Sequence, residues 1–401
     1  MTIKLKKFKD LISKNGLFSD GNWIESKDQN PDGSVRLIQL ADIGVGKFID
    51  KSNRFMTEER ANDLNCTYLV EGDILVARMP DPIGRACIFP QVQQKCVTVV
   101  DICIIRPDSD QIGTRWLMHL INSKHFNNQV LQYVTGTTRQ RISRGNLAKL
   151  DVEVPPLDEQ KRIAAILDKA DAIRRKRQQA IQLADDFLRS VFLDMFGDPI
   201  TNPKGFKKAA ITEMSEVITG YAFKSAEYVQ DSENSVRLCR GANTLTGYFE
   251  WKDTAYWDKD KLKGIESYII NSGDVILAMD RPWISSGLKV CIFPENQRTT
   301  YLVQRVARIR PKQAIYTDYL YSCILSSAFE KHCCPTETTV PHISPVELKN
   351  FEVLVPDKKL VQKYHDVVFK VRSSMLAMEE SLLEANSAFN SLSQKAFAGE
   401  L

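Results

Sequence analysis

Two long stretches of the chain carry apolar residues at helical spacing and contain almost no residue that breaks a helix. The first follows Pro155-Pro156, offers Asp158 as an N-cap and meets its first glycine at Gly197. The second runs from residue 356 to residue 401, and after Pro356 it is free of glycine and proline until Gly399. A helix of about 38 residues is about 57 Å long, because each residue adds 1.5 Å. Such a helix must project beyond a single small domain.

The apolar residues of both predicted helices alternate at spacings of three and four, so each helix carries one apolar stripe. Two helices with matching stripes predict an intramolecular antiparallel coiled coil. The alternative is that each stripe packs separately on its own globular domain. The residues expected to form this helical frame and to dock partners are Ile163, Ile166, Ile173, Phe187, Val368, Met375, Leu382 and Phe389.

The remainder of the chain is an internal repeat with an offset of 201 residues. Gly72–Ile74 returns as Gly273–Val275, whereas Cys87–Pro90 returns as Cys291–Pro294 at an offset of 204, which implies three extra residues near 281–288. Repeats are sought before any fold is assigned, because they determine the organisation of the whole chain. We therefore expect a module over 1–154, a central helix over 155–198, a second module over 199–355 and a C-terminal helix over 356–401.

Each module mixes strand and helix signals. Short β-branched runs bounded by glycine and proline predict strands, and apolar residues at helical spacing predict two further helices. Few strands joined by long crossovers favour an α+β fold for each module. The strands are expected at 73–77, 86–89, 97–105, 274–278, 290–293 and 302–309, and the helices at 114–133 and 317–332.

Composition places the chain among soluble globular proteins. Hydrophobic residues make up 43% and charged residues 26%. No apolar run approaches 18 residues and the N-terminus lacks the apolar centre of a secretory signal, so we expect a cytoplasmic protein without a membrane segment. The nine cysteines fall in no CxxC spacing, which favours reduced, mostly buried thiols over a zinc site. A net charge of +4 permits a polyanionic partner without requiring one.

Several fragments that resemble catalytic motifs lack their essential parts. Gly44–Lys47 has neither the upstream glycine nor the following Ser or Thr of a phosphate-binding loop. Pro356–Lys359 hints at a nuclease metal site, but it aligns with the start of the first long helix at Pro156–Glu159. The tetrapeptide that holds an amino group for methylation is absent, and the five histidines are scattered singly. We therefore expect a chain that is not catalytic by itself and binds no metal or cofactor.

Basic, amide and hydroxyl side chains gather in predicted loops of both modules. Arginine, asparagine and glutamine suit guanine edges, adenine edges and phosphates. A loop arginine more often positions a phosphate than reads a base, so both roles remain open. The candidate DNA-binding residues are Arg36, Arg78, Arg85, Thr138, Arg139, Gln140, Arg141, Arg144, Arg237, Arg240, Arg281, Trp283, Lys289, Thr338, Thr339 and His342.

These segments resemble the specificity subunit of a type I DNA restriction-modification enzyme. The resemblance rests on VPPLDEQKRIAAILDKADAIRRKRQQ, FLDMFGDP, AFAGEL, GTTRQRISRGNL and the duplicated GDILVAR and GDVILAM, and it covers the whole chain. It implies two target-recognition domains separated by two long antiparallel helices, related by an approximate two-fold axis. One departure is that the second loop, TETTVPHISP, lacks the arginines of the first.

The resemblance also implies a function and partners. It predicts a non-catalytic subunit that reads a bipartite, asymmetric site on double-stranded DNA in a restriction-modification system. It further implies two methyltransferase subunits that modify adenine N6 and, in some members, two restriction subunits that act as motor and nuclease. S-adenosylmethionine, ATP and Mg²⁺ are then expected on the partner subunits rather than on this chain.

Two other functions are compatible with parts of the pattern. An architectural protein could use the coiled coil to hold protein partners without reading a DNA sequence. A self-sufficient methyltransferase would need cofactor and target-base motifs that this sequence lacks. Co-purification with a methyltransferase and site-specific protection of DNA separate the architectural alternative from a specificity subunit. Binding of S-adenosylmethionine by the isolated chain would support the self-sufficient methyltransferase.

Overall fold

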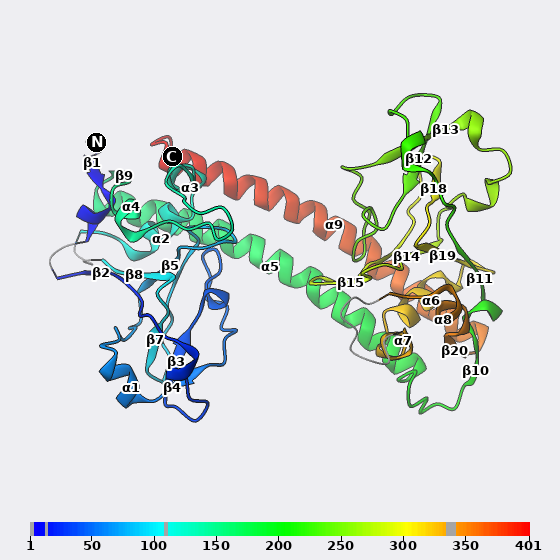
Figure 1. The fold of residues 1–401 in the computed structure, drawn as a ribbon, viewed down its shortest axis with the longest axis horizontal. Helices are drawn as coiled ribbons and strands as arrows, with labels where there is room; N and C mark the ends of the chain where they lie inside the picture. Colours follow the sequence, from blue (N-terminus) through cyan, green and yellow to red (C-terminus); the bar gives the residue numbers. More distant parts are fainter. Residues whose placement is uncertain (1–3, 13–14, 108–110, 334–341) are drawn as a thin grey trace. The chain divides into compact units, whose positions relative to one another are not determined.

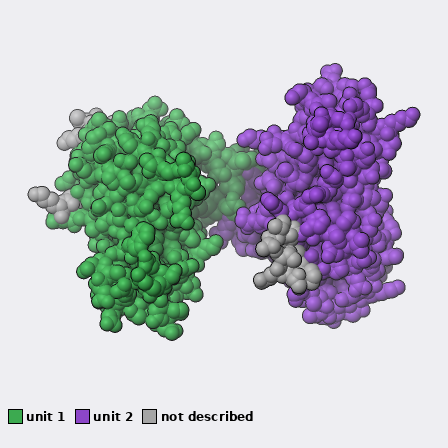
Figure 2. All heavy atoms as spheres, in the orientation of Figure 1, with its two compact units in different colours: residues 1–178, 380–401 green, residues 179–379 purple. Residues whose placement is uncertain are grey.

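The fold is that of a computed structural model, which describes residues 4–12, 15–107, 111–333 and 342–401. The chain folds as two compact units, which Figure 2 distinguishes by colour. Unit 1 comprises residues 1–178 and 380–401, and unit 2 comprises residues 179–379. The structure thus assigns half of each long helix to each unit, whereas the sequence suggested two modules and two separate helices.

The two long helices are α5, Leu157–Phe196, and α9, Lys358–Phe397, each of 40 residues (Figure 1). Both predicted helices are therefore confirmed. Gly197 follows α5 with a φ of 79°, in the left-handed region that glycine adopts without steric cost. The expected N-cap was wrong by two residues: Pro156 O accepts the first helical hydrogen bond from Gln160 N, so Asp158 lies within the first turn.

The halves of α5 and α9 run antiparallel within each unit. In unit 1, Arg162 donates to the Leu401 carbonyl at 2.6 Å and Arg177 to the Ser381 carbonyl at 2.5 Å, so later residues of α5 meet earlier residues of α9. In unit 2 the rings of Phe196 and Tyr364 lie 5.2 Å apart between centroids. The antiparallel pairing expected from the two apolar stripes is confirmed inside each unit.

Unit 1 is built on a four-stranded antiparallel sheet of order β2-β8-β5-β6, beside a smaller sheet of order β4-β3-β7. β1 pairs with β9 separately, and β3 and β7 are parallel. The strands are β1 Lys4–Lys7, β2 Leu17–Asp20, β3 Val35–Ile38, β4 Phe55–Met56, β5 Ile74–Ala77, β6 Ala86–Ile88, β7 Cys96–Thr98, β8 Ile102–Arg106 and β9 Asp151–Val154. The shorter helices are α1 Glu58–Asp63, α2 Thr114–Ile121, α3 Lys124–Gln132 and α4 Arg144–Ala148.

Unit 2 repeats this topology. Its sheets have the orders β11-β19-β14-β17, β13-β12-β18 and β10-β20, and β12 and β18 are parallel. The strands are β10 Lys207–Ala210, β11 Ser215–Thr219, β12 Ser235–Cys239, β13 Ala255–Asp258, β14 Val275–Ala278, β15 Trp283–Ile284, β16 Gly287–Leu288, β17 Val290–Ile292, β18 Thr300–Leu302, β19 Val306–Pro311 and β20 Glu352–Val355. The shorter helices are α6 Tyr316–Ile324, α7 Ser327–Cys333 and α8 Pro345–Asn350. The internal repeat and the mixed α and β composition are therefore confirmed.

Each four-stranded sheet is covered on both faces. In unit 1, Ile74 and Val76 of β5 face Trp116 of α2 and a cluster that includes Leu167 of α5 and Phe397 of α9. The alternating residues of the same strand, Leu75 and Ala77, face a second cluster with Ile38 and Phe89. Unit 2 has the equivalent main core around Val275, Leu277 and Phe196. The long helices therefore complete both cores.

Four predicted elements are each divided in two. The run 97–105 forms β7 and β8, and the run 302–309 forms β18 and β19. The expected helix 114–133 is α2 and α3, because the Ser123 side chain accepts from Phe126 N at 3.1 Å and starts a new helix. The expected helix 317–332 divides in the same way into α6 and α7.

The eight cysteines in the described ranges are buried, as expected for structural thiols. Burial raises the pKa of Cys87 to about 12 and that of Cys96 to about 11. None of the described helices combines the length and the apolar character that crossing a membrane requires.

Candidate nucleic-acid interface

In unit 1 the predicted arginine-rich loop is a closed turn beside the end of β5. Thr135 and Arg141 exchange two backbone hydrogen bonds of 2.9 Å, and Ile142 N donates to the Arg78 carbonyl at 3.0 Å. Gly136 has a φ of 94°, and a Cβ at this position would lie 2.5 Å from a backbone oxygen of the same turn. The turn therefore requires glycine, and its side chains project from a fixed backbone.

Two carboxylates hold three of the arginines around this turn. Asp20 lies 3.3 Å from Nε of Arg78 and 3.5 Å from Nε of Arg144. Asp101 lies 3.3 Å from a terminal nitrogen of Arg141. The side chains of Arg141 and Arg144 are 40% and 45% exposed. They can therefore contact a ligand while Asp101 and Asp20 hold their orientation.

The tip of the turn is free. Thr138, Arg139 and Gln140 are exposed, and their side chains form no hydrogen bond or ion pair with any residue in the described parts of the chain. A guanidinium and an amide that face solvent are suited to bases or phosphates. Of the residues predicted from the sequence, this group has the geometry best suited to DNA.

Arg85 has a different role from the one expected. Its guanidinium donates to the carbonyls of Ile43, Leu40, Met79 and Pro82 at 2.6, 2.9, 3.0 and 3.0 Å, and the residue is buried. Burial lowers the pKa of Arg85. These four bonds join the turn after β5 to the segment after β3, so they argue against direct contact of Arg85 with a base.

Three more of the predicted arginines also point inward. Arg78 donates to the Val100 carbonyl and is buried, which lowers its pKa. Arg36 is paired with Asp50 at 2.5 Å. Arg237 is buried, stacks 3.7 Å from the Trp251 ring centroid and donates to other side chains, namely Thr300 and Gln297. In this arrangement Arg36 and Arg237 stabilise the three-stranded sheets, and Arg78 joins the end of β5 to the segment before β8.

The equivalent place in unit 2 carries different charges. Asp280, directly after β14, lies 2.6 Å from Arg305 and 2.5 Å from Nδ1 of His342. Burial would raise the pKa of the Asp280 carboxyl, but the hydrogen bonds from Arg305 and His342 together hold it below its usual value. Ile343 N donates to the Met279 carbonyl, as Ile142 does to Arg78 in unit 1.

The other predicted residues of unit 2 lie nearby but differ in exposure. Arg281 is exposed, Trp283 is half-buried, and Lys289 donates to the Gly241 carbonyl at 3.1 Å. Burial lowers the pKa of Lys289. Arg240 donates to the carbonyl of Asp253. The two predicted positions Thr338 and Thr339 lie outside the described residues.

The residues expected to form the helical frame differ in how deeply they are buried. Ile163 and Val368 are buried, and the half-buried members are Ile166, Met375, Leu382 and Phe389. Ile173 and Phe187 are 43% and 51% exposed, so they do not lie in the packed stripe, and their expected role in docking partners stays a prediction. At the turn of Ile173 the inward position belongs to Arg174, whose guanidinium lies 4.1 Å from the Phe389 ring centroid.

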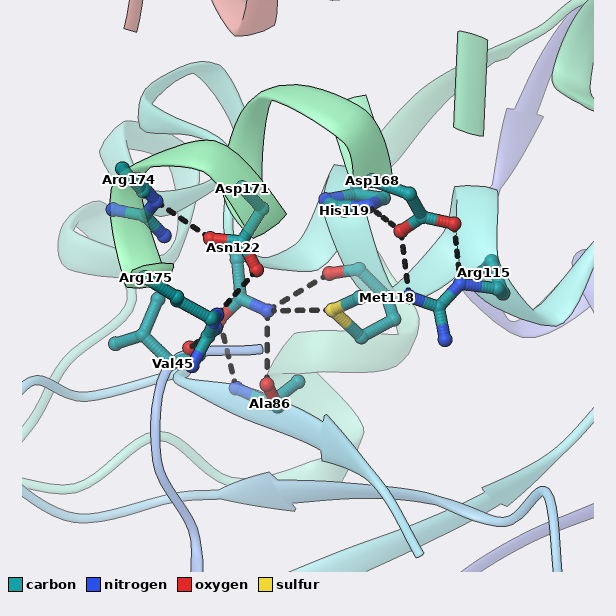
Figure 3. A network of polar contacts seen from close by, with 10 residues as sticks. All are labelled: Val45, Ala86, Arg115, Met118, His119, Asn122, Asp168, Asp171, Arg174 and Arg175. Atoms are coloured by element: carbon teal, nitrogen blue, oxygen red, sulfur yellow. Dashed lines mark hydrogen bonds and ion pairs between the residues drawn. The ribbon is translucent and has the colours of Figure 1, made fainter. Parts of the chain in front are cut away.

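A polar network in unit 1 ties the β-sheet domain to α5 (Figure 3). Asp168 of α5 accepts from Arg115 at 2.5 and 2.6 Å and lies 2.7 Å from Nε2 of His119, both on α2. His119 is buried, which lowers its pKa, and Asp168 only partly opposes this effect. On the next turns of α5, Arg175 donates to the Val45 carbonyl at 3.0 Å. Arg175 therefore joins α5 to the segment after β3, a role that sequence patterns did not reveal.

Sequence reasoning also missed the acidic partners at both sites, Asp20, Asp101 and Asp280. No motif marks them, because each meets its arginine only through the fold. No group of three or more His, Cys, Asp or Glu residues in the described ranges has the arrangement of a metal site.

Comparison with known proteins identifies this architecture. The family model of the type I restriction modification DNA specificity domain matches residues 3–183. This result confirms the resemblance drawn from the sequence, and the topology of unit 2 repeats that of the specificity domain in unit 1.

Curated relatives of the specificity domain are themselves specificity subunits. The MjaVIII specificity subunit of Methanocaldococcus jannaschii is 26% identical over 233 residues, which cover 55% of each chain. The EcoAI specificity subunit of Escherichia coli is 30% identical over 153 residues, 38% of this chain and 26% of that one. The chain thus spans about half the length of the first relative and about a quarter of the second.

A solved structure extends the likeness to the whole fold. The type I restriction-modification S subunit from M. genitalium is 13% identical, covers 99% of this chain and 96% of its own, and has a TM-score of 0.55. At this identity the likeness concerns the fold alone.

Proposed function

We propose that this chain is the non-catalytic specificity subunit of a type I restriction-modification complex and that it reads a bipartite, asymmetric site on double-stranded DNA. The observation that carries this proposal is the repetition in unit 2 of the fold that matches the specificity-domain model, with partly exposed charged side chains near the ends of the equivalent strands β5 and β14. Two similar modules are suited to two half-sites, as in dimeric DNA-binding proteins, where each subunit binds one half-site.

The two half-sites should differ in sequence. Unit 1 presents Arg139, Gln140 and Arg141 beside Asp101, whereas unit 2 presents Arg305 and His342 around a carboxylate. Donors and acceptors at equivalent places are therefore different, and base edges are discriminated by donor and acceptor pattern. An asymmetric target follows from this difference.

Partner subunits should supply the chemistry. We infer that two methyltransferase subunits bind this chain and that two restriction subunits join in a full complex, with S-adenosylmethionine, ATP and Mg²⁺ bound by those partners. Support comes from apolar side chains exposed on the long helices, a feature that marks protein interaction sites. These residues are Ile173, Leu183, Phe187, Phe369, Leu376 and Leu383.

Methylome sequencing of cells that carry or lack the gene tests this proposal. We expect a two-part motif with an unspecified spacer whose adenine N6 methylation depends on the gene. Identical methylomes in a strain that expresses the gene would contradict the proposal. The purified chain should show no methyltransferase, nuclease or ATPase activity, and detection of any of these would contradict a purely recognising role.

A further inference from the structure

A β-hairpin distinguishes unit 2 from unit 1. β15 and β16 pair through Trp283↔Leu288 and Ile284↔Gly287. The hairpin follows β14 in the chain, and Figure 1 labels its first strand, β15. The described residues of unit 1 hold no such pair of strands between β5 and β6. The three extra residues implied by the change of repeat offset fall within this hairpin.

The base of the hairpin is held firmly. Leu288 and Pro282 are buried, and Trp283 packs against the main core of unit 2. Lys289 N donates to the Pro282 carbonyl at 2.7 Å, and its ammonium group donates to the Gly241 carbonyl. Both strands therefore leave the domain from fixed points.

The tip is also held on one side. The hydroxyl groups of Ser286 and Thr246 lie 3.2 Å apart, which joins the hairpin to the turn 244–249. Gly287 has a φ of 120°, and a Cβ there would lie 3.3 Å from a methyl carbon of Thr246. The hydrogen bond between Ser286 and Thr246 limits how far the hairpin can move, so the exposed side chains of the hairpin are preorganised.

The exposed side chains have the chemistry that reads base edges. Ile284 is 39% exposed, and Ser285 and Ser286 are exposed. An aliphatic group contacts the thymine methyl, and a serine hydroxyl donates to or accepts from base edges. Arg281 is exposed beside them, and Arg305 has a side chain that is 71% exposed and oriented by Asp280. These two cations are placed to contact phosphates.

We propose that the β15–β16 hairpin reads bases in the half-site recognised by unit 2, through Ile284 and the Ser285 hydroxyl, while Arg281 and Arg305 contact the flanking phosphates. A two-stranded β-ribbon fits the major groove of B-DNA, which is about 12 Å wide. This proposal rests on the proposed function, because it names the reading element of one of its two modules.

The test uses methylome sequencing of cells whose chromosomal gene is replaced by Ile284→Ala, Ser285→Ala or Val229→Ala. Val229 is the matched control, because it is an apolar residue of unit 2 with 37% exposure, close to that of Ile284, and it lies away from the hairpin beside Tyr256. We expect each tip variant to relax one position in one half of the motif, with discrimination falling about tenfold. The other half and the Val229→Ala motif should remain unchanged.

The outcomes separate this inference from the proposed function. A wild-type strain without a gene-dependent two-part motif contradicts the proposed function itself. A wild-type motif that both tip variants reproduce unchanged overturns the hairpin proposal alone. Complete loss of methylation in tip variants that melt at the wild-type temperature also overturns it, because loss of one reading contact changes preference rather than abolishing activity.

Discussion

Units 1 and 2 have similar interiors but differ in the residues at their surfaces. In unit 1 the buried carboxylate of Asp73 accepts from Arg106 at 2.7 and 2.9 Å, and in unit 2 that of Asp274 accepts twice from Arg310 at 2.7 Å. These pairs join the start of the central strand to the end of its neighbour in each four-stranded sheet. The same buried interaction has therefore been kept in both repeats.

At the opposite end of the same strands the two units place their charged residues differently. Asp101 in unit 1 occupies the place of Arg305 in unit 2, at the repeat offset of 204, and Arg141 occupies the place of His342. In unit 1 Arg141 pairs with Asp101, whereas in unit 2 both Arg305 and His342 pair with Asp280. The two units therefore share one sheet scaffold, while the charged residues at this end of the sheet differ between them.

The largest expected effect comes from exchanging one module. Replacement of the residues before Val154 by the equivalent region of another specificity subunit should change one half of the methylated motif completely and leave the other half intact. The reason is that the β-strands of unit 1 form no sheet with those of unit 2 in the described parts of the chain. Methylome sequencing of the chimera measures this, and a change in both halves would refute independent reading.

Removal of either shared carboxylate should destabilise the unit that contains it. Asp73→Ala and Asp274→Ala should each lower the free energy of unfolding by about 3 kcal/mol, because a buried partner of an arginine is lost. Denaturant unfolding followed by tryptophan fluorescence measures the loss. Asp151→Ala, which removes a half-exposed pair with Lys7, is the control and should cost less than about 1 kcal/mol. Equal losses in the control and the variants would argue against a buried scaffold pair.

The arginines of the unit 1 turn provide a finer comparison. Substitution of Arg139, Arg141 or Arg144 by alanine should cost about 1–3 kcal/mol of binding if the residue reads a base, and should relax one position of one half-site. Loss of a phosphate contact should weaken all sequences alike and reduce the salt dependence by about one charge. Binding titrations of the methyltransferase complex at several salt concentrations distinguish these roles. Wild-type affinity and salt dependence in all three variants would show that the turn does not touch DNA.

The smallest effect concerns pH and unit 1. Because burial keeps the pKa of His119 below its ordinary 6.5, the unfolded chain takes up a proton at a higher pH than the folded one. Stability should therefore be fully present above about pH 6.5 and fall as the pH is lowered further. His119→Gln should reduce this dependence by on the order of 1 kcal/mol between pH 7.5 and 5.5. If the free energy of unfolding changes with pH in the same way in wild type and in His119→Gln, His119 does not cause the pH dependence.

Much of the architecture could be predicted from sequence because its signals are local. Helical spacing and the absence of glycine determine α5 and α9, and the repeat appears directly as matching segments. The divided strands were missed because the turn at Val99–Asp101 contains neither glycine nor proline, and Arg305 adopts a left-handed φ of 64° that arginine rarely takes. Such turns depend on tertiary contacts.

The candidate site was only partly accessible to sequence reasoning. An exposed turn with Arg139 and Gln140 follows from composition, since polar loops lie at the surface. Composition does not reveal whether a loop arginine points outward or inward. Arg85 points inward because it donates to four carbonyls that only the folded chain brings together. The acidic partners and the β15–β16 hairpin were missed for the same reason.

The division of the chain into units has a consequence for biosynthesis. Unit 2 is continuous in sequence, but unit 1 draws Ala396 and Phe397 into its core from beyond the whole of unit 2. A ribosome adds the intervening 200 or so residues in roughly 10–40 s, at 5–20 residues per second. During this interval the nascent first module lacks the packing of Phe397 against Trp116, so the later-made unit is complete before the earlier one.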